Sequence, residues 1–392
     1  MPFQSKLPDV GTTIFTVMSR RARELGALNL GQGFPDYDID PRITELTAEA
    51  MTEGRNQYAP MEGVMELREQ IAAKLALCYG VSVSPEAEVT ITVGGTEALY
   101  CAVQAMVAHG DEAIVFDPAY DSYDPAVRLA GGRCIHIPLV PPAFRYDWGR
   151  VAATITDRTR LIIINTPHNP ACTAATADDL DKLAEVIRGR DIYVLSDEVY
   201  EHVTYDGRRH VSVLAHPELR ERSFAVFSFG KTLHATGLRV GYSVAPAELT
   251  RELRKVHQFN TFSIAHPTQQ AIARYLAEKP QAWQCLPAFF QAKRDRVRAA
   301  LEGTGFVAPP AQGTYFQLVE YTAFSNAPDV EFAERLLTEA GVATIPLSPF
   351  YKDPPRLTML RLCVAKKDQT LDDAIDRLRS FASGLAPEDD DG

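Results

Sequence analysis

The 392-residue sequence has few of the features that mark several protein classes. It contains only six cysteines, which form no Cys-x-x-Cys pair and lie mostly among apolar residues. This usage is typical of buried thiols in a reducing compartment, so we predict no disulfides, no metal site and a cytoplasmic location. The sequence also lacks an apolar run long enough to cross a membrane, and its first residues lack the apolar stretch of a signal peptide.

Positive charge is scarce as well. Lysine and arginine together number 40 against 51 aspartates and glutamates, which gives a formal net charge of -11. Because nucleic-acid-binding faces need clustered basic residues, this balance argues against a nucleic-acid partner. The 46% hydrophobic and 23% charged residues match an ordinary globular protein, and 392 residues exceed the usual size of one hydrophobic core. We therefore expect two packed units.

Helix-like and strand-like segments alternate between about residues 60 and 240. Leu67, Ile71 and Leu75 repeat on one helix face, and a short β-branched run at 89–93 stops at two glycines. Continuous apolar runs follow at 113–116, 161–164, 192–195 and 224–227. Runs without alternation are typical of strands covered on both faces, so the pattern predicts an α/β fold with a mainly parallel sheet between helices.

The two ends of the chain differ from this central part. Helical patterns at 292–301 and 331–340 are interspersed with strand-like segments near 313–318 and 360–364. We expect both ends to combine into a smaller second domain. The predicted division is an N-terminal arm and part of the small domain at 1–45, a large domain at 46–285, a small C-terminal domain at 286–385 and a disordered acidic tail at 386–392.

Polar side chains gather where the predicted strands end, which is where open parallel sheets bind ligands. Gly95 and Thr96 lie between a strand and a helix, a position that offers unpaired N–H groups to an anion. Glycines also occur at such turns for geometry alone. Ser228 and Arg239 favour the anion site, because they can add a hydroxyl and a bidentate guanidinium to the same phosphate.

Two charged residues follow strongly apolar strands. Desolvation makes the neutral amine of Lys231 easier to form, which favours a nucleophile able to form a Schiff base. A lone lysine more often extends to solvent. Asp197 needs a partner if it is buried, and a protonated pyridine nitrogen would serve, although an aspartate here can also cap a helix.

These residues resemble the class I aminotransferases of fold type I, which use pyridoxal 5′-phosphate (PLP). The motifs are Asn-Pro at 169–170, Ser-Asp-Glu-Val-Tyr at 196–200, Ser-Phe-Gly-Lys-Thr at 228–232 and Gly-Leu-Arg-Val-Gly at 237–241. Further segments are similar to the branch of methionine aminotransferases and kynurenine–glutamine transaminases, namely those at 4–8, 29–36, 56–58 and 116–123. The resemblance covers roughly residues 4–380.

The resemblance implies a large PLP-binding domain with a mainly parallel seven-stranded sheet between helices, and a smaller α+β domain formed by both chain ends. It implies that Lys231 forms the Schiff base and shuttles the proton, that Asp197 pairs with the ring nitrogen, and that Asn169 and Tyr200 contact the phenolic oxygen. The remaining cofactor contacts that it implies are Tyr120 stacked on the ring, and Gly95, Thr96, Ser228, Arg239 and the neighbouring subunit's Tyr58 at the phosphate.

For the substrate, the resemblance implies that Arg361 binds the carboxylate with help from Asn169 and the backbone of Gly33. Phe15 and Tyr37 suggest an apolar side-chain pocket. The hypothesis is a homodimer with shared active sites that transfers the amino group of methionine, or of an aromatic or large apolar amino acid, to a 2-oxo acid by a ping-pong mechanism. A cysteine-conjugate carbon–sulfur β-lyase and a non-catalytic PLP-binding regulator remain alternatives.

Overall fold

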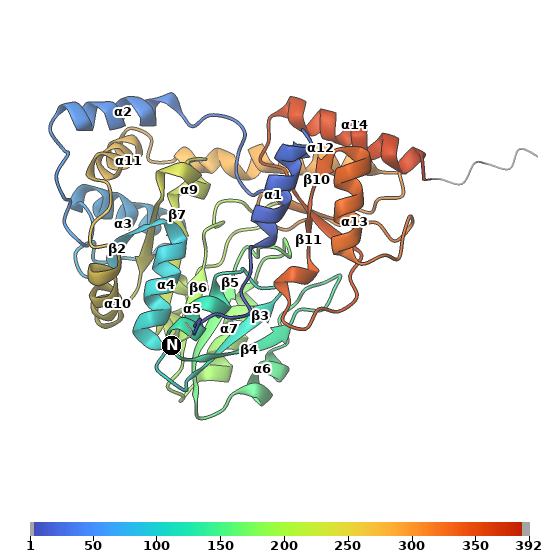
Figure 1. Cartoon of the computed structure of the whole chain (residues 1–392). Helices are drawn as coiled ribbons and strands as arrows, with labels where there is room; N and C mark the ends of the chain where they lie inside the picture. The colour runs from blue at the N-terminus through green and yellow to red at the C-terminus, as the bar shows by residue number, and fades with distance from the viewer. Residues whose placement is uncertain (1–3, 386–392) are drawn as a thin grey trace, which may run out of the picture.

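The computed structural model describes residues 4–385, so the acidic tail predicted at 386–392 lies outside the described residues. A large sheet lies between helices, and a smaller unit packs beside it (Figure 1). In the smaller unit, helix α1 (Ile14–Glu24) from the start of the chain lies among elements from its end. No helix of the described part of the chain is both long and apolar enough to span a membrane.

The large sheet has seven strands in the order β2-β8-β7-β6-β5-β3-β4. They are β2 (Val89–Val93), β3 (Glu112–Asp117), β4 (Arg133–Pro138), β5 (Thr159–Asn165), β6 (Tyr193–Asp197), β7 (Ser223–Ser228) and β8 (Val240–Val244). Only β8 runs antiparallel to its neighbours, β2 and β7. The predicted seven-stranded, mainly parallel sheet is therefore confirmed.

Helices cover both faces of this sheet. They are α3 (Met65–Tyr79), α4 (Gly94–Met106), α5 (Tyr123–Leu129), α6 (Trp148–Thr154), α7 (Ala177–Ile187), α8 (Pro217–Arg220), α9 (Phe229–Thr232), α10 (Ala247–Asn260) and α11 (His266–Glu278). Successive residues of β3 enter different cores: Ala113 and Val115 pack in one, Ile114 and Phe116 in the other. Both faces of the strand are thus buried, which explains its unbroken apolar run.

The smaller unit joins the two ends of the chain. Strand β1 (Leu28–Asn29) pairs in parallel with β10 (Val342–Ala343), and β11 (Ile345–Pro346), β12 (Met359–Cys363) and β9 (Phe316–Glu320) form an antiparallel sheet. Its other helices are α12 (Leu286–Leu301), α13 (Asp329–Arg335) with the π-helix η4 (Leu336–Ala340), and α14 (Asp368–Ser383). Helix α2 (Pro41–Thr52) packs along α11 of the large unit.

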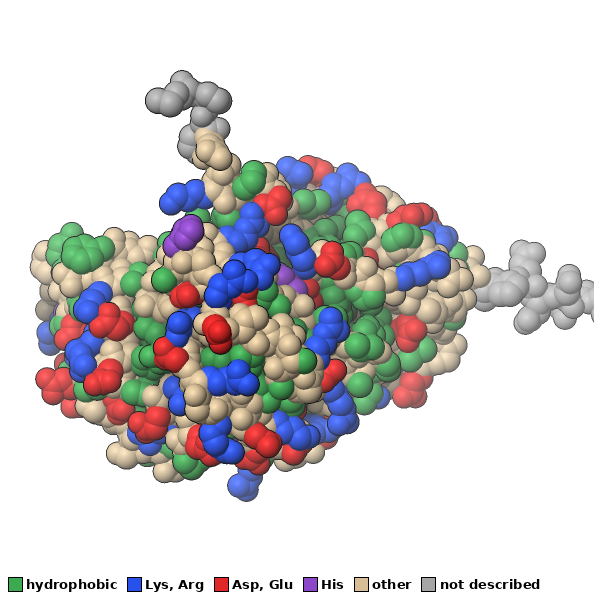
Figure 2. Space-filling view, turned by 90° about the horizontal axis from the view of Figure 1, so that it is seen from below, with side chains coloured by type: hydrophobic (Ala, Val, Ile, Leu, Met, Phe, Trp, Pro, Cys, Tyr) green, Lys and Arg blue, Asp and Glu red, His purple; other side chains and the backbone are tan. Residues whose placement is uncertain are grey.

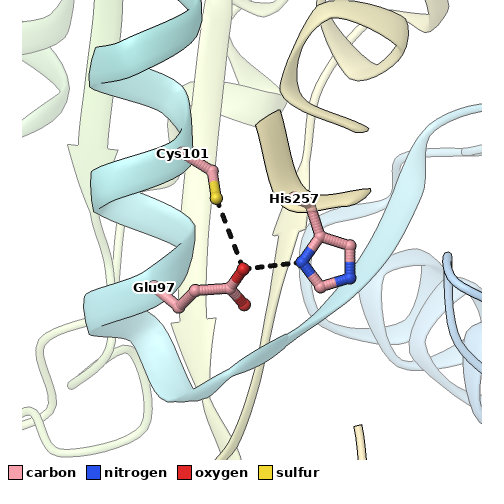
Figure 3. A group of neighbouring side chains, drawn as sticks. All are labelled: Glu97, Cys101 and His257. Carbon is pink, nitrogen blue, oxygen red and sulfur yellow. Dashed lines mark hydrogen bonds and ion pairs between the residues drawn. The ribbon is translucent and has the colours of Figure 1, made fainter. Parts of the chain in front are cut away.

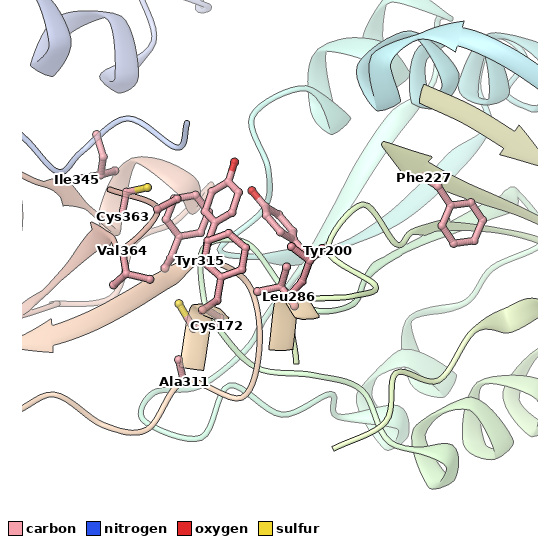
Figure 4. Close-up of a cluster of buried hydrophobic side chains, with 14 of the residues drawn as sticks. Cys172, Tyr200, Phe227, Leu286, Ala311, Tyr315, Ile345, Cys363 and Val364 are labelled. Carbon is pink, nitrogen blue, oxygen red and sulfur yellow. The ribbon is translucent and has the colours of Figure 1, made fainter. Parts of the chain in front are cut away.

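One of the two hydrophobic cores extends through both units. Short 3-10 turns connect several elements: η1 (Val213–Ala215), η2 (Thr236–Leu238), η3 (Ala282–Cys285) and η5 (Ser348–Phe350). Figure 4 shows part of the core, from Phe227 of the large sheet to Ile345 and Cys363 of the small one, with Tyr200 and Tyr315 between them. Because apolar contacts continue across this junction, the two units position each other's residues at the cleft between them.

Candidate active site

A cavity of about 300 Å³ opens at the carboxyl ends of β5, β6 and β7. Its lining includes the predicted site residues Phe15, Gly33, Gly95, Thr96, Tyr120, Asn169, Asp197, Tyr200, Ser228, Lys231, Arg239 and Arg361. Residues that the sequence analysis did not select also line it: Gln32, Leu99, Asp121, Asn165, Val199 and Phe316. Loops from both units therefore meet around one cavity.

Asn165 fixes the relative position of two of these loops. It is the last residue of β5 and lies opposite Asp197, the last residue of β6. Its side-chain amide donates to the carbonyl oxygen of Asp197 at 2.8 Å, and its side-chain oxygen accepts from the backbone N–H of Asn169 at 2.7 Å. Because both the donor and the acceptor of this buried side-chain amide are used, it holds Asn169 and Asp197 in a fixed arrangement.

Asp197 is a buried carboxyl group, 4% exposed, that forms no ion pair within residues 4–385. The hydroxyl of Tyr123 donates to its Oδ2 at 2.7 Å. Burial raises the pKa of Asp197 to about 6, and the hydrogen bond from Tyr123 opposes that rise. A buried carboxylate without a cationic partner is costly, so a protonated ring nitrogen suits this position.

Lys231 lies in α9, directly after β7. Burial lowers its pKa to about 8, because the charged ammonium loses water. The Nζ of Lys231 donates to the hydroxyl of Tyr315 at 2.7 Å, and that hydroxyl donates to the carbonyl oxygen of Gly33 at 2.6 Å. The lysine therefore has the depressed pKa that a Schiff-base nucleophile needs, and its amine has a defined direction.

The start of α4 forms an anion cradle. Gly94 has φ +69°, and a Cβ built on it would lie 2.6 Å from Nη2 of Arg239. A Cβ on Gly241 would lie 2.5 Å from the carbonyl carbon of Gly94. These glycines let the guanidinium and the backbone come together. Gly95 and Thr96 of the helix start line the same cavity as Ser228, and the first N–H groups of a helix have no partner within it.

A buried group of three side chains supports this cradle from behind (Figure 3). Glu97 Oε2 accepts from the backbone N–H of Val93 at 2.8 Å, while its Oε1 lies 2.6 Å from Nδ1 of His257 and 3.3 Å from Sγ of Cys101. The other ring nitrogen of His257 lies 2.9 Å from the carbonyl oxygen of Met61. Both ring nitrogens thus face oxygen atoms, which fixes the orientation of the imidazole ring.

Arg361 of β12 lies in the opposite wall and is fully buried. It donates to the side-chain oxygen of Asn169 and to the carbonyl oxygen of Gly31, while its Nε has no partner among the described residues. The guanidinium carbon lies 3.8 Å from the ring centre of Phe316 and 5.1 Å from that of Phe15. Burial lowers the pKa of Arg361. A buried cation without a carboxylate partner suits an anionic ligand.

Two predicted residues lie outside this cavity. Tyr37 packs edge-on against His234 and Phe289, with ring centres 5.3 Å and 5.9 Å away, so the structure does not bring it to the cavity of its own chain. Tyr58 is 82% exposed, and its ring packs edge-on against Phe262. An aromatic side chain this exposed is unusual, which is consistent with a contact to another molecule.

A family model described as aminotransferase class I and II matches residues 26–378. The chain belongs to this family. Its cofactor is PLP, and the features described above fit that molecule: an anion cradle, a buried unpaired carboxylate and a lysine of lowered pKa. It is an enzyme that transfers amino groups between amino acids and 2-oxo acids.

The chain is similar over almost its whole length to characterised members of the family. It is 51% identical over 378 residues to the methionine aminotransferase of Escherichia coli strain K12, covering 96% of this chain and 98% of the relative. The solved structure of YbdL from Escherichia coli, identified as having a methionine aminotransferase function, matches with a TM-score of 0.95 at 50% identity and covers 97% of this chain and 100% of that one. The N-succinyldiaminopimelate aminotransferase structure from Mycobacterium tuberculosis has a TM-score of 0.93 at 37% identity, with coverage of 97% and 100%.

Proposed function

We propose that this aminotransferase acts on methionine or another large apolar or aromatic amino acid. The observation that carries the proposal is Arg361, a buried guanidinium with an unpartnered Nε, framed by Phe15 and Phe316. It suits one carboxylate next to an apolar side chain. The other cations of the lining, Lys231 and Arg239, are assigned to the cofactor, so the lining offers no free cation for a second carboxylate. The similarity to methionine aminotransferase supports the same substrate class.

Bound PLP supplies a ring that withdraws electrons from the substrate Cα. The protein's own groups then divide the remaining work. Arg361 and Asn169 hold the substrate carboxylate, and the amine of Lys231 takes the proton from Cα and returns it, as a general base and acid. Asp197, held by Tyr123, keeps the ring nitrogen protonated. Tyr120 would lie against the ring, and Tyr200 and Asn169, which line the same cavity, would hydrogen-bond its phenolic oxygen.

We also propose that the enzyme is a homodimer in which Tyr58 reaches the phosphate of the partner's site. Tyr58, Phe262 and Phe259 are 82%, 42% and 87% exposed, and a patch of exposed aromatic side chains is typical of a protein interface. On the face shown in Figure 2, by contrast, acidic and basic side chains are interspersed. Size determination by light scattering tests this, and a monomer that is fully active at high dilution contradicts it.

Two further proposals concern location and domain division. Six free cysteines suit a reducing compartment, so we propose a cytoplasmic location, which fractionation of the source cells tests. We propose a large PLP-binding domain at 46–285, with 1–45 and 286–385 forming the small one. The pairing of β1 with β10 supports this division. Limited proteolysis tests it, because cleavage is expected first in the segments that join the two domains.

The substrate proposal is tested with purified enzyme loaded with PLP. Methionine alone should change the visible absorbance of the bound cofactor, a 2-oxo acid should restore it, and the 2-oxo acid derived from methionine should accumulate. Lys231→Ala should abolish turnover, whereas Lys255→Ala, which removes an exposed lysine on α10, should not. Aspartate as the best donor in a panel contradicts the proposal. Release of pyruvate and ammonia from a cysteine conjugate without any acceptor would instead favour the β-lyase.

A further inference from the structure

The cavity lining carries one charged side chain that the reaction does not use. Its charged members are Asp121, Asp197, Lys231, Arg239 and Arg361. Four of them have a partner in the proposed complex: the ring nitrogen, the cofactor aldehyde, the phosphate and the substrate carboxylate. Asp121 has none. The unassigned charge of the cavity is therefore negative.

Asp121 lies in the loop between β3 and α5, next to Tyr120. The residue as a whole is exposed, and it lines the cavity together with Phe15 and Arg361. Loss of water around its carboxyl group raises the pKa of Asp121, and the positive charge of Arg361 opposes that rise. Asp121 forms no ion pair with any residue between 4 and 385.

Every substrate presents a first carboxylate to Arg361, and Asp121 acts on it equally in all substrates. A second carboxylate, on the side chain, differs between substrates. It would enter a cavity that has no free cation and one free anion, where part of the surrounding water has been displaced. Repulsion there raises the free energy of complexes with dicarboxylate substrates relative to complexes with substrates whose side chains are neutral. This difference in free energy is what lets the enzyme discriminate between the two kinds of substrate.

We propose that Asp121 is a specificity-determining residue that selects against amino acids and 2-oxo acids carrying a second carboxylate. This inference rests on the proposed function, since it concerns the substrates of the same site. A ping-pong enzyme uses one cavity for both halves of its reaction, so the selection applies to donor and acceptor alike. Glutamate and aspartate are poor donors, and neutral 2-oxo acids are better acceptors than 2-oxoglutarate.

The test is a comparison of kcat/KM ratios in the holoenzyme and in Asp121→Asn, which keeps the shape of the side chain and removes its charge. The glutamate-to-methionine ratio should rise about tenfold, as expected for two charges several ångströms apart in a partly solvated site. The ratio of 2-oxoglutarate to a neutral 2-oxo acid should rise similarly. Asp121→Glu should retain the original selectivity.

A charge-matched control comes from Asp191→Asn. Asp191 is exposed and precedes β6, at the opposite edge of the sheet from the cavity, so its loss should leave both ratios unchanged. In the unmodified enzyme, discrimination against glutamate should weaken as the salt concentration rises from about 0.01 M to about 1 M, because salt screens exposed charges.

Equal ratios in the enzyme and Asp121→Asn, or selectivity that does not change with salt, would overturn the role of Asp121. Either result leaves the proposed function intact if methionine remains a good donor. If methionine is not a substrate of the unmodified enzyme, the proposed function itself fails. The salt experiment needs no variant, so the inference stays testable even if Asp121→Asn is inactive.

Discussion

The ε-amino group of Lys231 donates a 2.7 Å hydrogen bond to the hydroxyl of Tyr315. The Tyr315 proton is directed to the carbonyl oxygen of Gly33, so its oxygen faces the lysine as an acceptor. Tyr315 is 1% exposed, and burial raises its pKa well above the ordinary value, which keeps the phenol neutral. The contact thus links the reactive amine to the segment that is expected to bind substrate.

Tyr315→Phe should lower kcat about tenfold while changing KM less, because the amine loses the group that orients it. It should also lower the pKa of Lys231, because the lost acceptor stabilises the ammonium form. The pH profile of PLP capture by the apoenzyme measures this shift. Tyr321→Phe is the control, since Tyr321 is also buried and donates to a backbone carbonyl, that of Ala327. Identical pH profiles in the enzyme and Tyr315→Phe would exclude the orienting role.

The pKa of Lys231 sets a pH dependence for loading the cofactor. Its pKa is about 8 rather than the ordinary 10.5, and only the neutral amine attacks an aldehyde. The rate at which the apoenzyme captures PLP should therefore rise about tenfold per pH unit below pH 8 and level off above it. Stopped-flow absorbance measures the rate. A rise that continues to pH 10 would show that the amine is not desolvated.

In the large sheet, the sequence predicts β2 from its β-branched run and β3, β5, β6 and β7 from their continuous apolar runs. Strands β4 and β8 of this sheet are missed for different reasons. At the sheet edge, β4 is only partly buried, so His136 and Arg133 interrupt its apolar pattern. Strand β8 is buried, but Gly241 and Ser243 lie within it, and Gly241 is required because a Cβ there would meet the backbone of Gly94. That close approach joins residues far apart in the sequence, so the sequence around β8 carries no pattern that would reveal it.

Most site residues were predictable because they form part of a motif. Asn165 directly follows the run at 161–164 but was not selected, because its role depends on its register with Asp197. Tyr315 was missed because its contact with Lys231 joins residues 84 positions apart. For Tyr37 the sequence shows an aromatic ring near a motif but not the direction of that ring, which packs against His234 in the structure. Patterns identify residue types at an edge, whereas packing decides which of them face the cavity.

The hydrogen bond from Tyr123 to Asp197 should control the acidic limb of the pH–rate profile. Burial raises the pKa of Asp197 to about 6, and the Tyr123 hydroxyl opposes that rise by stabilising the carboxylate. Tyr123→Phe removes the donor, so the acidic limb of kcat/KM should move upward by about one pH unit. Tyr321→Phe again serves as the control. A limb that stays in place would show that Asp197 does not titrate in the observed range.

Breaking the pair of Glu97 and His257 should be strongly destabilising, since these residues are only 8% and 0% exposed. Glu97→Gln leaves His257 without its anionic partner and should lower the free energy of unfolding of the apoenzyme by about 3 kcal/mol. The matched control is Glu218→Gln, which breaks the exposed pair with Arg188 and should change the free energy of unfolding far less. Urea unfolding followed by circular dichroism measures both.

The pair of Glu97 and His257 also predicts how the difference in unfolding free energy between the enzyme and Glu97→Gln depends on pH. Burial raises the pKa of Glu97, but the hydrogen bond and charge of His257 outweigh this, so its pKa in the folded protein lies below the ordinary 4.5. A carboxyl group whose pKa is lowered by folding stabilises the protein above its ordinary pKa and loses that contribution as the pH falls through the folded value. The gap between the enzyme and Glu97→Gln should therefore be full at pH 7 and narrow below pH 4.5. A gap that is unchanged in acid would show that packing of the side chain, and not its charge, holds His257 and the Met61 segment against the phosphate cradle.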